Sequence, residues 1–128
     1  MATANDIITG ALRLLGVIAS GEAVPADQAQ DGLTALNQMI AGLKMDGIDL
    51  GLSTLTLAAV VAVPDEEVKA LRYLLAVDLA PEFTMAPPLI VAQQAESGRI
   101  TLQARYAVVE PMTLDPSLVF LPSQRRRW

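Results

Sequence analysis

Apolar residues recur at intervals of three and four over four stretches of the chain, the spacing that predicts amphipathic helices. The first stretch can be capped by Thr3 or Asn5 and stopped by Gly16, and the second starts at Pro25 and ends near Gly47. The expected helices are therefore residues 5–15, 25–46, 64–83 and 87–107. This pattern predicts an all-α, four-helix, bundle-like domain over residues 1–108.

The third stretch carries its own start and stop signals. Pro64 suits the first helical position, three carboxylates follow where the helix N-terminus is positive, and Pro81 lies where the helix should end. The carboxylates are Asp65, Glu66 and Glu67, and we interpret them as stabilising the first turn rather than as catalytic. The apolar face consists of Val68, Leu71, Leu75 and Leu79.

Two further helices carry features that predict their packing. Gly32 and Gly42 each lower helix propensity by roughly 1 kcal/mol relative to alanine, so we expect them to permit close contact with another helix; simple tolerance is the alternative. The inward side of the last helix is expected to hold Val91, Ala95, Gly98, Leu102 and Tyr106.

Residues 50–63 change to a period of two, which is typical of a strand and predicts an extended or β connector between the second and third helices. An isolated pair of strands is marginally stable in water, so the connector should pack either on its own helices or on a neighbouring subunit. We favour the neighbouring subunit. The side chains expected at that contact with a subunit or a tail protein are Leu52, Leu55, Leu57 and Val61.

Residues 109–128 contain three prolines and no clear period, which predicts an extended C-terminal arm. The arm is too apolar to remain in water without a partner surface. It could fold back over its own helices, or it could dock onto another protein through side chains typical of interface hot spots. The expected docking residues are Leu118, Phe120, Leu121, Arg125, Arg126, Arg127 and Trp128.

Composition excludes several chemistries. The chain has no cysteine and no histidine, so it has no disulfide, no thiolate or imidazole catalysis and no His-ligated zinc. Residues 1–20 lack the basic region of a signal peptide, and the longest apolar run, residues 57–63, is far shorter than the roughly 20 residues needed to span a bilayer. We expect a soluble protein that is not an enzyme, with no cofactor, no metal centre and no membrane contact.

The charge is unevenly placed along the sequence. Residues 1–124 hold 14 acidic and 6 basic side chains, a charge of −8, and the arginine triplet at 125–127 returns +3. An acidic body is repelled by phosphate and is a poor binder of duplex DNA. The acidic side chains could serve only solubility, or they could prevent a protein conduit from binding the DNA that passes through it.

A few carboxylates are candidates for sites. Asp46 and Asp49 lack the further oxygen ligands that calcium requires. Asp78 lies near the apolar stripe, where a structural ion pair with Arg13, Arg72 or Arg105 is the favoured interpretation. Asp78 with Glu82 is the one pair that could be considered for glycoside hydrolysis, but one helical turn supplies no cleft.

Four segments in order resemble the head-tail adaptor proteins of tailed bacteriophages and related phage-like particles, also called tail accessory or head completion factors. They are Asn5 to Gly16, Gly21-Glu22, Ala29 to Met39, and Pro64 to Phe83. The last is similar to the family's third helix, which reads Pro-x-Glu, Ala-Leu-x-Tyr-x-Leu-Ala and Leu-Ala-Pro-Glu-Phe or Tyr. The connector departs from the family pattern, because it is short and lacks a Pro-Gly turn.

The resemblance implies a structural protein of the virion neck, made in the cytoplasm of the bacterial host. Such subunits form a ring, typically twelvefold, below the portal and join the capsid to a tail-side stopper or tail protein. DNA passes through the ring without specific binding. Two alternatives come from other classes: a small soluble helical regulatory or binding module, and a virion-associated cell-wall hydrolase.

Overall fold

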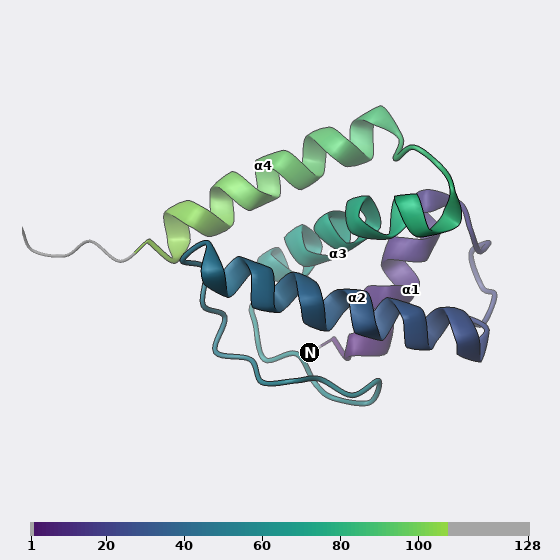
Figure 1. Cartoon of the computed structure of the whole chain (residues 1–128), viewed down its shortest axis with the longest axis horizontal. Coiled ribbons are helices and arrows are strands. Elements are labelled where there is room, and N and C mark those ends of the chain that lie inside the picture. Colours follow the sequence, from purple (N-terminus) through teal and green to yellow (C-terminus); the bar gives the residue numbers. More distant parts are fainter. Residues whose placement is uncertain (1, 108–128) are drawn as a thin grey trace, which may run out of the picture.

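The computed structural model describes residues 2–107 of the chain, and within that range it contains four α-helices and no β-strand. The helices are α1 (Ala4–Leu15), α2 (Ala26–Met45), α3 (Asp65–Leu79) and α4 (Leu89–Arg105), and a short 3-10 helix, η1 (Ala80–Phe83), continues α3. The expected all-α class and the order of the helices are thus confirmed. Figure 1 shows this order from the N-terminus to the end of α4.

The helix boundaries follow from local chemistry. Thr3 caps α1 in a capping box, in which its hydroxyl accepts from the Asp6 N–H and the Asp6 carboxylate accepts from the Thr3 N–H. Gly16 ends α1 with a φ of 75°, a left-handed conformation that glycine adopts without steric cost. The third predicted helix is shorter than expected, because the chain changes to 3-10 geometry at Ala80, next to Pro81.

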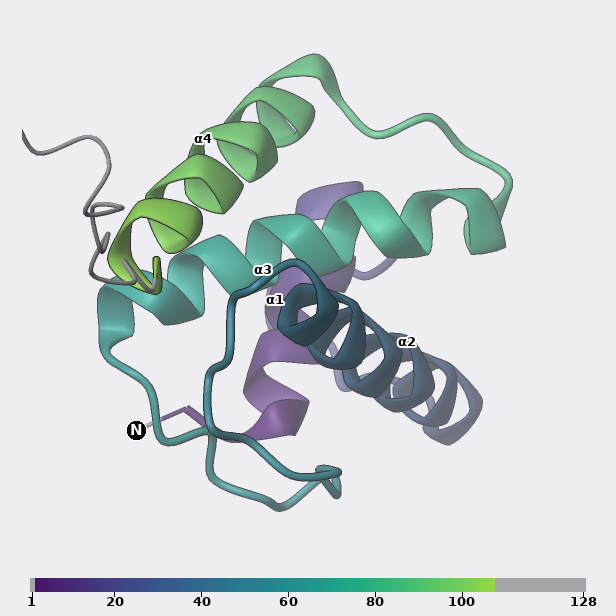
Figure 2. The same ribbon diagram turned by 60° about the vertical axis from the view of Figure 1, so that its left-hand side comes forward.

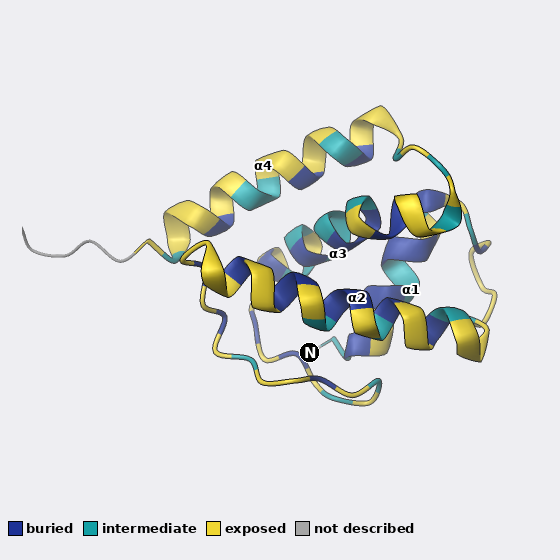
Figure 3. Cartoon of the chain, viewed as in Figure 1, coloured by how far each residue is buried: buried dark blue, intermediate teal, exposed yellow. Residues whose placement is uncertain are grey.

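Helix α3 lies at the centre of the molecule. It contacts α1 and α2 on one side, and α4 packs along its other side (Figures 1 and 2). Figure 3 shows that the buried residues of α4 face α3, while most of the rest of α4 is exposed. The largest fully buried side chains are Ile7, Ile8, Leu12, Leu36, Ile48, Val61, Leu71, Leu75, Leu79 and Leu102.

Two glycines allow the helices to approach closely. A Cβ atom on Gly32 of α2 would lie 2.5 Å from the Cγ2 methyl of Ile8, and one on Gly98 of α4 would lie 3.0 Å from the Cβ of Ala70. Gly42 has nothing within 4 Å of that position, so the expected role in helix contact holds for Gly32 and is wrong for Gly42. The inward side predicted for α4 is confirmed, since Val91, Ala95 and Leu102 are buried and Gly98 and Tyr106 are partly buried.

The connector at residues 50–63 differs from the prediction of a strand or hairpin. Its only ladder-type pairing within the described range is an isolated antiparallel bridge between Thr3 and Val60. Backbone bonds join it to the start of α1: the Ala4 N–H donates to the Ala59 carbonyl at 2.9 Å, and the Val61 N–H donates to the Ala2 carbonyl at 2.9 Å. The N-terminal segment thus satisfies backbone groups that a hairpin partner would otherwise have bonded.

The side chain of Asn37 holds the middle of the connector against α2. Its Oδ1 accepts from the Leu55 N–H at 2.9 Å, and its Nδ2 donates to the Leu55 carbonyl at 3.2 Å. Leu50, Leu55, Val61 and Val63 of this segment are buried. The connector therefore packs on its own chain, which was the less favoured of the two expectations.

Candidate functional site

The residues predicted to bind partners fall into two groups. Leu118, Phe120, Leu121, Arg125, Arg126, Arg127 and Trp128 of the arm all lie outside the described residues. In the connector, Leu55 and Val61 are buried in the core, whereas Leu52 and Leu57 are partly exposed. The contact with a neighbouring subunit stays a prediction. Of the four connector residues expected there, only Leu52 and Leu57 have side chains that a neighbour could reach in this conformation.

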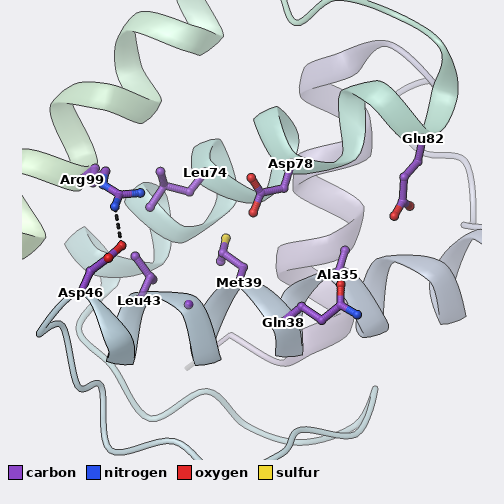
Figure 4. Close-up of a pocket in the computed structure, with 10 residues that line it drawn as sticks. Ala35, Gln38, Met39, Leu43, Asp46, Leu74, Asp78, Glu82 and Arg99 are labelled. Carbon is purple, nitrogen blue, oxygen red and sulfur yellow. Dashed lines mark hydrogen bonds and ion pairs between the residues drawn. The ribbon is translucent and has the colours of Figure 1, made fainter.

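A hollow of about 390 Å³ opens between α2, α3 and α4 (Figure 4). Part of its lining is apolar, and its polar groups are mostly carboxylates. The lining residues are Ala35, Gln38, Met39, Gly42, Leu43, Asp46, Leu74, Asp78, Glu82 and Arg99.

An ion pair closes one end of the hollow. Arg99 of α4 bonds the carboxylate of Asp46, which follows the last residue of α2, and thereby links two helices that otherwise diverge (Figure 4). Both side chains are more than a third exposed, at 38% and 44%, so water screens the pair and its net contribution to stability is small.

Asp78 projects into the hollow from α3 and forms no ion pair with any described residue. Loss of water around it raises the pKa of Asp78 above its ordinary value, and the positive charge of Arg99 acts in the opposite direction. The expected ion pair of Asp78 with Arg13, Arg72 or Arg105 is absent from the part of the chain that the structure describes. The carboxylate is free to accept hydrogen bonds from a cationic group that enters the hollow.

Glu82, the other member of the pair considered for hydrolysis, lies on η1 just beyond the end of α3. The two carboxylates thus come from one continuous run of helix, and both line the hollow (Figure 4). The α2 side of the hollow presents Gln38 and the ion-paired Asp46. This arrangement suits recognition of a cation, and it places no second free carboxylate on the facing helix.

A second polar cluster joins the start of α3 to the end of α4. Glu67 is only 3% exposed, and its Oε2 accepts a hydrogen bond of 2.5 Å from the Tyr106 hydroxyl. Arg105 places its Nε 2.9 Å from Glu67 Oε1 and its NH1 3.1 Å from Glu66. The Arg105 N–H is not aligned with Glu67 Oε1, so that contact is charge attraction rather than a hydrogen bond.

This cluster corrects the interpretation of Glu67 as a first-turn residue alone. The bond to Glu67, and to a lesser extent burial, raise the pKa of Tyr106. The sequence indicated that Glu67 would be buried, because Glu67, Leu71 and Leu75 are spaced four residues apart and so lie on the same helix face. A carboxylate on an apolar stripe needs a partner, and the nearest polar residues of α4 supply it.

Neither a membrane span nor a metal cluster is found among the residues that the structure describes. No helix in residues 2–107 is both long enough and apolar enough to cross a bilayer. Asp46 and Asp49 do not belong to any group of three or more metal-binding side chains in that range.

Comparison with known proteins adds no assignment: no protein-family model and no curated protein matches this chain. The resemblance to head-tail adaptors therefore rests on the four sequence segments alone.

Proposed function

We propose that this chain is a head-tail adaptor, a structural protein that forms a ring below the portal of a tailed phage or phage-like particle and joins the capsid to the tail. The proposal rests on the amino-acid sequences of the four segments and on their order along the chain. Three of the segments coincide with α1, the middle of α2, and α3 with η1, and Gly21-Glu22 lies in the loop between α1 and α2. The helical architecture is compatible with such an adaptor.

The exposed surface of the domain supports an assembling protein. Within residues 2–107, five large apolar side chains on α2, the connector and α4 are more than half exposed, and a neighbouring subunit or a partner could bury them. They are Met45, Val60, Leu89, Ile90 and Ile100. In a ring, each subunit would cover such positions on the next, and a closed cyclic interface would leave none unpaired.

The charge of the domain supports the role of a DNA conduit. Residues 2–107 hold twelve acidic and six basic side chains, a formal charge of −6. A surface of this sign repels phosphate, so DNA would pass without being retained. The proposal assigns no catalytic step to the protein, and its action is binding and shape.

The test is electron microscopy of the purified full-length chain mixed with the portal protein of the same particle. We expect the chain alone to sediment as a monomer or small oligomer and the mixture to show a second ring, typically twelvefold, beneath the portal. Rings formed by the chain without portal would contradict gating of assembly by the portal. A stoichiometric complex with a soluble protein, and no binding to portal, would instead favour a helical regulatory module.

The arm provides a control for the same experiment. A variant that lacks residues 109–128 keeps all four described helices, and we expect it to retain their circular dichroism. We expect it to lose portal binding. Portal-bound rings of this variant would show that the arm does not supply the contact.

A further inference from the structure

The hollow that contains Asp78 has a neighbour on the other side of the Asp46–Arg99 ion pair. A second hollow, of about 380 Å³, is lined by Asp46, Gly47, Ile48, Gln103 and Ala107. Asp46 lines both hollows, so they adjoin at the end of the molecule where Asp46 and Arg99 join α2 to α4. Ala107, the last residue that the structure describes, lines the second hollow, so the described chain ends beside the groove that the two hollows form together.

The groove has the chemistry of an arginine site. Met39, Leu43 and Leu74 can cover the methylene groups of a long side chain, while Asp78 and Glu82 offer carboxylates with no ionic partner among the described residues. A guanidinium group presents several N–H donors in one plane and binds carboxylates more favourably than an ammonium does. Arg99 occupies one end through Asp46, and the Asp78 end is open to a second cation.

The chain carries that cation in its own C-terminal segment. Residues 2–107 have a charge of −6, whereas residues 108–128 have two acidic and three basic side chains, with the basic ones adjacent at 125–127. We propose that the arginine triplet Arg125–Arg127 binds in the groove between α2, α3 and α4 of the same chain, with Asp78 and Glu82 as its acceptors.

Length and concentration favour the same chain over a second copy. Arg125 follows Ala107 by eighteen residues, and such a segment can span up to about 60 Å. A short tether gives its end an effective concentration on the order of millimolar. A second copy at micromolar concentration competes poorly with this, so the groove binds its own arginines in the free protein.

This inference does not depend on the adaptor proposal, because it concerns the isolated chain. Together the two would explain gated assembly: a partner that binds the arm must first displace it from the groove. Apolar surface and charge on the arm would then become available only in the presence of that partner.

The absence of cysteine from the sequence permits a clean test by disulfide formation in the full-length protein. In the groove pair, Gln38→Cys places a thiol on the exposed lining of the groove, and Ser123→Cys places one just before the arginine triplet. The control pair combines Ser123→Cys with Gln93→Cys, an exposed position on α4 that lines neither hollow. Both pairs share the thiol at position 123 and therefore the same tether.

We expect the disulfide of the groove pair to form within one chain about tenfold faster than that of the control pair, the preference that one charge-assisted contact would supply. Replacing all three arginines by glutamine should abolish the difference. Equal rates for the two pairs would overturn the proposal, and so would cross-linked dimers as the main product, since they would place the triplet on a second copy.

A second set of variants tests the acceptors. In the protein that carries the groove pair, Asp78→Asn with Glu82→Gln should reduce the rate of disulfide formation to that of the control pair. Asp27→Asn with Glu96→Gln removes the same charge from exposed positions outside both hollows and should leave the rate unchanged. Equal effects of the two double variants would show that net charge, rather than the groove, attracts the triplet.

Discussion

Two glycines in one helix provide a sharp test of the packing, because the same substitution should act in opposite directions at the two positions. Gly32 and Gly42 both lie inside α2, and replacing either by alanine should improve helix propensity by roughly 1 kcal/mol. At Gly42 nothing lies within 4 Å of the new Cβ. Gly42→Ala should therefore raise the free energy of unfolding by about that amount.

Gly32 differs because it is buried against α1. Its Cβ would lie 2.5 Å from the Cγ2 methyl of Ile8, a side chain with no exposed surface and little room to move. Overpacking of this kind costs typically about 1–3 kcal/mol, which offsets or exceeds the gain in propensity. We expect Gly32→Ala to be up to about 2 kcal/mol less stable than the parent and about 1–3 kcal/mol less stable than Gly42→Ala.

Urea unfolding followed by circular dichroism measures both variants on one scale. The clash can be assigned to Ile8 by a double-mutant cycle, since Ile8→Ala should cost less in the Gly32→Ala background than in the parent. If Gly32→Ala stabilises the protein as much as Gly42→Ala does, the close approach of α1 and α2 is wrong.

Three further outcomes follow from the polar contacts. Tyr106→Phe should lower the free energy of unfolding by about 1–3 kcal/mol, because it removes the hydroxyl bonded to the buried Glu67; Tyr73→Phe, with no hydroxyl bond among the described contacts, is the control in the same urea titration. The raised pKa of Tyr106 means that the folded state retains its proton more strongly than the unfolded state does. Its contribution should be complete below the ordinary tyrosine pKa of 10.0 and decline as pH rises through the folded value, so the parent should lose more stability than Tyr106→Phe in alkaline denaturant titrations. Asn37→Ala should cost about 1–3 kcal/mol and increase amide exchange at Leu55, because both polar groups of Leu55 lose their partner; unchanged exchange there would contradict the role of Asn37 in holding the connector.

Much of the helical framework could be predicted from local sequence. The capping residue Thr3, the stop at Gly16 and the prolines before α2, α3 and α4 each act within a few residues, so their effect is readable without knowledge of the fold. The inward side of α4 was equally readable from its spacing. These features depend on backbone chemistry and helical period alone.

The connector could not be predicted, because its partner is distant in sequence. Alternation of apolar residues at 50–63 is equally suited to a strand and to an irregular segment that buries every second side chain. The choice depends on the N-terminal backbone and on Asn37, which bond the connector from other elements. Gly42 illustrates the same limit: only the neighbours of a glycine reveal whether its missing side chain matters.

The groove between α2, α3 and α4 also could not be predicted from the sequence. Asp78 could be placed near an apolar stripe, but the divergence of α2 and α4 that leaves it accessible is a property of three packed helices. That Glu67 would need a polar partner could in principle be predicted, since it lies on the apolar face of α3. Its partners Arg105 and Tyr106 lie 38 and 39 residues further along the chain.

The position of α4 at the edge of the molecule has a consequence for how the domain opens. Its main packing partner is α3, and it buries only Val91, Ala95 and Leu102, whereas α1 buries six residues and α2 seven. Elements with few buried neighbours undergo local unfolding at lower free energy than the rest of a domain. Helix α4 should therefore behave as a separate cooperative unit, able to detach from α1, α2 and α3 while they remain folded.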